Sequence, residues 1–496
     1  MAMFCRQRSG LISVLLVFLL ATFASYGLAQ NDTRGHTQFV NSGSEAAQQD
    51  FLDGLLMLHS FQYEDARELF LAAQQIDPDF VMAYWGEAMT HNYPLWFDEP
   101  QVDAAVAALA KLGESTADQL AKAPTERERA YLAAVQKLFG AGERQSRDVA
   151  YLAAMQQLAE DYPEDLDAAL FLALAHLGAS HGGRDVAIYM QAAAIAEEVF
   201  ARNPRHPGAA HYLIHSYDDP IHAPLGLRAA RIYADLAPSA SHAQHMPSHI
   251  FYALGMWQEA TQSNIDAYVS DSDRSAERGI ALSTHGYHAI WWLLYSQLQE
   301  GLTADALDTL EQAERHFTSE ESTSLSREII VFMHTHYAIE TGDWHHAFDT
   351  PGIDWIGLEG RSLAAHSYVR AGAALEDGDI NGAKEILDGL EDALSNDDVG
   401  SQIMQLELEA MIQLKEGNGA AAMVSMERAT ALEESMPLYF GPPWPIKPSH
   451  ELYGEMLLEL GRPVEAAAQF SEGLARLPGR ALSLTGLARA EQDGGQ

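Results

Sequence analysis

A pattern of small and large residues occurs twice in this chain, at two places 400 positions apart. The two copies run Gly54, Ala66, Phe70, Ala73, Pro78 and Gly454, Ala466, Phe470, Gly473, Pro478. The successive offsets are 12, 4, 3 and 5 residues in both. Small residues let two helices approach closely, a large residue fills the space between them, and proline ends the second helix. The spacing therefore predicts a chain built from helical hairpins.

Further glycines mark turns between helices, each followed by alanine at hairpin spacing: Gly255, Gly301, Gly342, Gly378 and Gly417. Helical periodicity runs almost from end to end, without a strand-like alternation of useful length. An array of hairpins extends its core along one axis, so 496 residues need not divide into several domain cores. We expect an all-α solenoid over residues 46–490, with a histidine-rich centre at 170–295. A flexible N-terminus at 30–45 and a frayed tail at 491–496 would flank it.

The repeat spacings resemble the tetratricopeptide repeat (TPR) family. This resemblance implies a right-handed superhelical α-solenoid in which the first helix of each hairpin lines a concave groove. Longer runs resemble a bacterial family of exported TPR proteins that has no assigned activity: AHYLIHSYDDP, HAQHMPSHIF, GMWQEATQSN and the early segment beginning HSFQYEDARELF. The second resemblance covers most of the chain and implies a fold, but no reaction.

The N-terminus has the features of a secretory signal peptide. Arg6 and Arg8 precede an apolar stretch, and Gly27-Leu28-Ala29 offers a small-residue cleavage site. We therefore expect residues 1–29 to be a signal peptide and the mature protein to be periplasmic or secreted. After cleavage it would have no stable membrane span, and an uncleaved anchor is the alternative.

Charge and cysteine content exclude several classes of function. A formal net charge of −40 repels phosphate backbones, so nucleic acid is excluded as a partner. The only cysteine, Cys5, lies in the predicted signal peptide, so the mature chain has no disulfide, thiolate nucleophile or cysteine-ligated zinc. The sequence also lacks phosphate-binding glycine loops and a GxSxG elbow. Any metal site must use histidine, carboxylate, methionine or water.

Histidines recur at nearly the period of the repeat: His176; His211 and His215; His242, His245 and His249; His285 and His288. Equivalent members are separated by 35, 34 and 36 residues. Successive hairpins would therefore stack these side chains along one face. Imidazole is the commonest transition-metal ligand and titrates near neutral pH, so a converging row of histidines indicates metal or proton chemistry.

The local spacing of the histidines supports this interpretation. His211 and His215 lie one helical turn apart, as in the HExxH motif, but Tyr212 stands where the glutamate of a zinc protease would be. Pro247 suits the first turn of a helix, which would leave His242 and His245 in an entry loop. In the same hairpin, Asn264 occupies the position of the large apolar residue, and a buried amide there needs a partner.

We expect three or four residues to bind one transition-metal ion, from the set His211, His215, His245, His249, His285 and His288. Weaker candidates are His176, His242, Asp218 and Asp219, the two carboxylates serving as ligands or as acceptors for imidazole N–H groups. Without thiols the site suits zinc, copper, nickel or a histidine/carboxylate iron centre, and the affinity order favours copper. If the site is catalytic, the metal would activate water or dioxygen, as in a metal-dependent hydrolase or oxidoreductase, with His285 or His288 moving protons.

Two other interpretations remain open at this stage. The first is a metal-free interaction scaffold whose groove holds a protein or peptide, with basic partners favoured by the acidic field. The second is a pH-sensitive groove in which clustered imidazoles repel once they are protonated. The sequence does not determine the oligomeric state.

Overall fold

The computed structural model describes residues 34–95, 100–317, 323–346, 348, 353, 355–394, 398–438 and 440–495. The described residues belong to one compact unit, Arg34–Gln496. The predicted signal peptide lies outside the described residues and stays a prediction. Within them, no helix has both the length and the apolar character needed to cross a bilayer.

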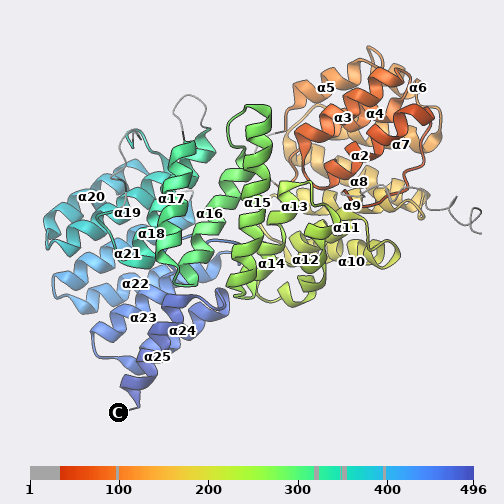
Figure 1. Cartoon of the computed structure of the whole chain (residues 1–496). Coiled ribbons are helices and arrows are strands. Elements are labelled where there is room, and N and C mark those ends of the chain that lie inside the picture. Colours follow the sequence, from red (N-terminus) through yellow and green to blue (C-terminus); the bar gives the residue numbers. More distant parts are fainter. Residues whose placement is uncertain are drawn as a thin grey trace, which may run out of the picture. The chain divides into compact units, whose positions relative to one another are not determined.

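Over the described residues this unit is helical and contains no strand, which confirms the all-α solenoid of hairpins (Figure 1). Each helix packs against its neighbours along the chain. The elements are η1 (Glu45–Ala47), α2 (Gln48–His59), α3 (Tyr63–Ile76), α4 (Val81–Met89), α5 (Val102–Ala110), α6 (Thr116–Ala121), α7 (Glu126–Leu138), α8 (Arg144–Asp161), α9 (Leu166–Gly178), α10 (Val186–Arg202), α11 (Pro207–Tyr217), α12 (Ala223–Leu236), α13 (Ser241–His245), α14 (Pro247–Ala253), α15 (Trp257–Arg278), α16 (Thr284–Gln299), α17 (Thr303–His316), α18 (Ser324–Thr341), α19 (Gly360–Glu376), α20 (Ile380–Ala393), α21 (Val399–Lys415), α22 (Gly419–Ser435), α23 (Ser449–Glu459), α24 (Pro463–Arg476) and α25 (Ala481–Gly494).

The small-and-large signature of the sequence marks close approaches between helices. Phe70 of α3 is fully buried, and a Cβ added at Gly86 of α4 would lie 2.4 Å from its ring. In the last hairpins Phe470 of α24 lies in the same way between two glycines. A Cβ would meet its ring at 2.7 Å from Gly454 and at 2.3 Å from Gly486. Burying such a ring stabilises the fold by about 1.5–3 kcal/mol, and only glycine leaves room for it.

The five glycines predicted to mark turns all have left-handed backbone, with φ between +67° and +80°: Gly255, Gly301, Gly342, Gly378 and Gly417. Glycine adopts this conformation without a steric penalty. Four of them precede the second helix of a hairpin, which is α15, α17, α20 or α22. Gly342 differs, because the described residues between it and α19 form no helix. The prediction of a second helix after Gly342 is therefore wrong over the described residues.

The N-terminal segment is packed from residue 34 onward, so the flexible stretch expected over residues 30–45 is wrong there. Phe39 is buried, and the Arg127 guanidinium lies 4.2 Å above its ring. Thr37 donates a hydrogen bond of 2.7 Å to Asp167. The apolar ring and these polar contacts hold the segment against the first hairpins. Burying the Phe39 ring removes apolar surface from water, which favours the ordered segment over a free tail.

The segment between α24 and α25 returns to the middle of the chain. The indole Nε1 of Trp257 on α15 donates to the carbonyl oxygen of Gly479 at 2.8 Å. α25 continues to Gly494, so the tail predicted over residues 491–496 is helical up to that residue. Arg480, which follows Gly479 in the chain, donates to the Tyr295 hydroxyl on α16 at 2.6 Å, so this segment contacts a helix that carries His285 and His288.

Candidate metal centre

Two of the histidines lie one turn apart on α11. Pro207 occupies the first turn of this helix, where its missing N–H is not needed. His211 and His215 follow on one face; His211 is fully buried and His215 is partly buried. Their Nε2 atoms are 3.1 Å apart.

Three more histidines come from an interrupted helix. α13 ends at His245, and α14 begins at Pro247 after the single residue Met246. The expectation that His242 and His245 lie in a loop is therefore wrong. Proline at the first position of α14 is tolerated, so the helix restarts there instead of ending. The Nε2 atoms of His245 and His249 lie 3.1 Å apart.

The last two histidines lie at the start of α16. Ser283 caps this helix, and its hydroxyl accepts hydrogen bonds from the backbone N–H groups of His285 and Gly286. The cap places His285 and His288 in the first two turns. The His288 ring centroid is 4.6 Å from that of His245, and the His285 ring stacks on His242 at 5.0 Å.

The structure gathers six of these side chains into two groups of three. We call them the α11 triad (His211, His215 and His242) and the α14 triad (His245, His249 and His288). Within each triad, one nitrogen of every ring lies within 4.8 Å of the others. In the α11 triad, the Nε2 atoms of His211 and His242 are 3.2 Å apart. The α14 triad takes all three of its histidines from the expected set, whereas the α11 triad includes His242, a weaker candidate, and His285 belongs to neither.

The nitrogen separations match those of donors around one ion. A zinc–nitrogen bond is about 2.0–2.1 Å long, so two nitrogens on one ion lie about 2.9 Å apart at a right angle and about 3.3 Å apart at the tetrahedral angle. The Nε2 atoms of His211–His215, His211–His242 and His245–His249, at 3.1–3.2 Å, fall within this range, and the remaining pairs lie within 4.8 Å.

Carbonyl groups behind the rings fix which nitrogen carries the hydrogen. His211 Nδ1 lies 2.7 Å from the backbone oxygen of His59, and His245 Nδ1 lies 2.6 Å from Oδ1 of Asn264. The Asn264 amide is oriented by its own N–H donation to the Ala260 carbonyl at 2.8 Å. Because carbonyl oxygens only accept, both Nδ1 atoms donate and both Nε2 atoms present lone pairs. Such contacts orient imidazoles for metal binding.

Asp218 has the same role and lies between the triads. Its Oδ2 is 3.0 Å from Nδ1 of His249 and 3.9 Å from Nδ1 of His215. Arg184 holds the other Asp218 oxygen and contacts Asp219 at 2.8 Å. Asp218 is therefore an acceptor behind the His249 ring. Asp219 instead contacts Arg184 and His222, outside both triads.

Burial keeps the rings neutral at ordinary pH. Burial lowers the pKa of His211 to about 3, and neighbouring imidazoles contribute in the same direction. Burial also lowers the pKa values of the other triad histidines for which a shift is resolved: His215, His242, His245 and His288. Neutral imidazole is the form that binds metal.

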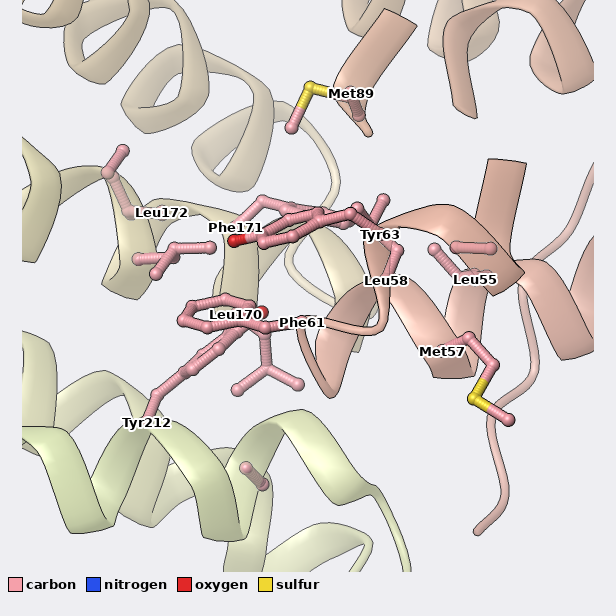
Figure 2. Packing of buried hydrophobic residues seen from close by; sticks show 14 of the residues in the cluster. Leu55, Met57, Leu58, Phe61, Tyr63, Met89, Leu170, Phe171, Leu172 and Tyr212 are labelled. Carbon is pink, nitrogen blue, oxygen red and sulfur yellow. The ribbon is translucent and has the colours of Figure 1, made fainter. Parts of the chain in front are cut away.

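Phe61 covers the α11 triad. Its ring centroid lies 4.4 Å from that of His211 and 5.5 Å from that of His242. Its φ of +56° is unusual for a bulky residue and persists because the surrounding packing holds it. Figure 2 shows Phe61 at the turn after α2, beside Tyr212 of α11.

The α14 triad has a separate aromatic cover. The Trp292 ring stacks on His249 at 4.5 Å and meets the edge of His245 at 4.8 Å. Phe440, from the segment between α22 and α23, stacks on His249 at 5.4 Å. Four of the triad histidines are buried, and His215 and His288 are half-buried. The sequence left open whether the groove is open or capped, and aromatic rings cover both triads in the described part of the chain.

A pocket of about 460 Å³ adjoins the α11 triad. It is lined by Phe61, Gln62, Tyr63, Glu64, Tyr93, Gln101, Asp271, Arg274, Ser283, Thr284 and His285. His285, which stacks on His242, forms part of its wall. The Tyr63 hydroxyl is buried and has no hydrogen-bond partner among the described residues. The pocket is thus a route by which a small molecule could approach the centre.

His176 lies outside both triads in the described part of the chain. It has the repeat spacing to His211, but it occupies the last turn of α9, whereas His211 lies in the middle of α11. The repeat period determines which face of a helix a residue occupies. The length and position of the helix determine how far along that face the residue lies.

A further buried group was not predicted from the sequence. Nε2 of His59 and Nε2 of His206 lie 3.1 and 3.2 Å from the same oxygen of Asp167, and all three residues are fully buried. Two N–H donors on one carboxylate are satisfied without an ion. The group supports the α11 triad, because the His59 backbone accepts from His211. Its members come from three distant helix ends, so no spacing in the sequence signals it.

Comparison with known proteins adds little about function. No family model matches the sequence, and no curated protein matches it. Among solved structures, the chain is similar to the Cut9–Hcn1 hetero-tetramer of the APC/C, with 15% identity over 96% of this chain and 81% of that chain, and a TM-score of 0.36. It is also similar to yeast Tom70, with 12% identity over 91% of this chain and 89% of that chain, and a TM-score of 0.33. A third similar structure is a Rap protein complexed with competence and sporulation factor, with 14% identity over 79% of this chain and 98% of that chain, and a TM-score of 0.37.

The chain has a TPR-like helical-repeat fold. Because the similarity scores are low, this statement rests on the hairpins themselves, on the buried phenylalanines between glycines and on the left-handed turn glycines.

Proposed function

We propose that this protein is an exported TPR-like protein that binds transition-metal ions through its buried histidine triads. The observation that carries the proposal is the pair formed by His245 and His249. Each donates from Nδ1, to Asn264 and to Asp218, and their Nε2 atoms face each other at 3.1 Å.

Two lone pairs at that distance repel unless a cation lies between them. A proton can join two nitrogens, but here three rings converge, and the arrangement occurs twice. A transition-metal ion accepts three imidazoles at once, and imidazole suits zinc, copper, nickel and iron. The support from Asn264 and Asp218 is the kind of contact that orients metal-binding histidines.

Three histidines leave a coordination position open on each ion. A bound metal in such a position could activate water or dioxygen, which would make the protein a metal-dependent hydrolase or oxidoreductase. The pocket beside His285 supplies access for a small substrate, and His285 is placed to move a proton between that pocket and the centre.

Metal analysis tests the proposal. The full chain carrying Cys5→Ser, which removes the only thiol, would be purified without chelators or a histidine tag and loaded with copper or zinc. We expect bound metal that survives desalting, and its loss from the α14 triad in His245→Ala and His249→Ala. His345→Ala is the matched control, because this side chain is 55% exposed and far from the triads in sequence. Metal-free protein after loading with copper, zinc, nickel and iron would contradict the proposal.

Export is tested separately. The signal peptide predicted over residues 1–29 would be removed, so that the mature protein begins at Gln30. N-terminal sequencing of protein from the cell envelope and the medium checks this expectation. A chain that keeps Met1 in the cytoplasm would contradict it.

A second candidate function is the metal-free scaffold, for which a different surface is relevant. A pocket of about 710 Å³ beside α19 and α20 has an apolar floor that includes Trp344, Phe348 and Leu363. Asp377 and Glu385 line its rim, so an extended basic peptide would fit its charge. Peptide binding that depends on these carboxylates, in a protein that takes up no metal, would favour the scaffold.

A further inference from the structure

We propose that the centre is dinuclear and holds two copper ions, one in the α11 triad and one in the α14 triad. This inference rests on the proposed metal-binding function and adds the number, the identity and the separate placement of the ions.

The two triads are complete without sharing a ligand. The α11 triad takes its nitrogens from α11 and α13, and the α14 triad takes its nitrogens from α13, α14 and α16. Each triad has its own aromatic cover, Phe61 over the first and Trp292 over the second. Each also has its own acceptors behind the rings, the His59 carbonyl for His211 and the Asn264 amide for His245. Two independently supported triads are what two ions require.

The triads are also adjacent. The ring centroids of His215 and His249 are 5.5 Å apart, and those of His242 and His245 are 6.2 Å apart. Asp218 lies between them, with one oxygen facing Nδ1 of both His215 and His249. Asp218 accepts from Nδ1 of His249 at 3.0 Å, whereas His215 lies 3.9 Å from it, beyond hydrogen-bond distance, so the carboxylate orients a ligand of the α14 triad alone.

Charge favours copper in its monovalent state. Imidazole is a neutral ligand, and Asp218 shares the positive charge of Arg184 with Asp219. Two divalent ions would bring four positive charges into a buried site, which is costly without anionic ligands. Two cuprous ions bring half that charge and readily accept three nitrogen donors. In the divalent state copper also stands above zinc, nickel and iron in affinity.

The test is an anaerobic titration of the metal-free full chain, carrying Cys5→Ser, with cuprous ion against the chromophoric chelator bicinchoninate. We expect two equivalents of copper to be taken from the chelator. His215→Ala and His288→Ala, one in each triad, should each retain one equivalent, and the double variant should retain none. His345→Ala should retain two. Circular dichroism checks that each variant keeps its helices.

The outcomes separate this inference from the function on which it rests. If the protein with both triads unaltered took up only one equivalent of copper, the dinuclear centre would be overturned, while the proposed metal binding would stand. Loss of both equivalents in a folded single-triad variant would overturn the independence of the two sites. Two equivalents of zinc bound more tightly than copper would overturn the identity of the ions. No uptake of any metal would overturn the proposed function itself.

Discussion

Asn264 shows how a single residue can connect the hairpin repeat to the histidine triads. It stands where Phe70 and Phe470 fill their own hairpins, and a polar side chain at that buried position requires a partner. The structure supplies the partner: Asn264 accepts from Nδ1 of His245 and donates to the Ala260 carbonyl. The departure of Asn264 from the repeat pattern thus coincides with its contact to a triad histidine.

Replacing Asn264 by leucine should weaken one metal site without emptying the other. The His245 ring would lose the acceptor that fixes its hydrogen on Nδ1, and such losses typically reduce metal affinity about 10–100-fold. Competition titrations would measure this change in the α14 triad. Gln262→Leu, at an exposed position on the same helix, is the control and should leave affinity unchanged. Equal weakening by both substitutions would contradict the assigned role of Asn264.

The metal-free protein should lose stability on acidification. Burial lowers the pKa of His59 to about 4 and that of His211 to about 3 in the folded state, against about 6.5 in the unfolded chain. Between those values the unfolded chain binds more protons, so the free energy of unfolding falls as the pH falls below about 6.5. Each such histidine contributes a loss of about 2 kcal/mol between pH 6.5 and pH 5. Urea denaturation at the two pH values measures it, and equal stability at both would contradict it.

At the scale of the helix, the hairpin signature acts through steric contact. Small residues recur where a neighbouring helix inserts a ring, and the ring of Phe470 lies between α23 and α25 in the last hairpin as Phe70 does between α2 and α4 in the first. The glycine backbone approaches the phenylalanine ring more closely than a residue with a side chain would permit. This explains why the same four spacings appear at both ends of the chain.

The two glycines of the last hairpin should respond in opposite ways to alanine. A Cβ at Gly454 would lie 2.7 Å from the Phe470 ring, so Gly454→Ala should lower the free energy of unfolding by about 1–3 kcal/mol through overpacking. A Cβ at Gly473 would meet its nearest neighbour at 3.5 Å, an ordinary contact. Gly473→Ala should therefore be neutral or stabilising by about 0.5–1 kcal/mol through helix propensity. Urea denaturation of both variants decides; equal effects would contradict the steric explanation.

At the scale of the whole folded unit, the C-terminal hairpins support the middle of the chain. Arg480 is buried and its guanidinium contacts Glu451 at 2.7 Å and Glu340 at 2.6 Å, so it joins α18, α23 and the start of α25. Trp257 bonds to Gly479 next to it. The segment that precedes α23 carries Phe440 onto His249. The cover of the α14 triad thus depends on residues some two hundred positions away.

Removing Arg480 should be far more damaging than removing an exposed arginine. Arg480→Met leaves Glu340 buried without its ion-pair partner and Glu451 with Lys447 alone, which should lower the free energy of unfolding by about 3–5 kcal/mol. Arg462→Met breaks an ion pair with Glu465 that lies at the surface, and should leave stability unchanged. Thermal and urea denaturation compare the two. A mild effect at Arg480 would show that the network does not hold the C-terminal hairpins in place.

Helical period and steric pattern made much of this protein predictable from its sequence. Positions three or four apart share a helix face, and glycine, alanine and phenylalanine at fixed offsets require two helices to meet. These rules gave the hairpins, the turn glycines and five of the six triad histidines. They also gave His285 a place in the site, although it stands beside His242 and outside both triads.

The tertiary structure decided how the rings are grouped. Whether His242 or His176 joins a triad depends on the depth of each residue along its helix and on where α13 restarts at Pro247, and neither follows from a repeat period. The division into two triads depends on side-chain orientation, which Asn264, Asp218 and the His59 carbonyl impose from other hairpins. Helical periodicity depends on residues that are close in the sequence. The direction of an imidazole nitrogen depends on contacts between residues that only folding brings together.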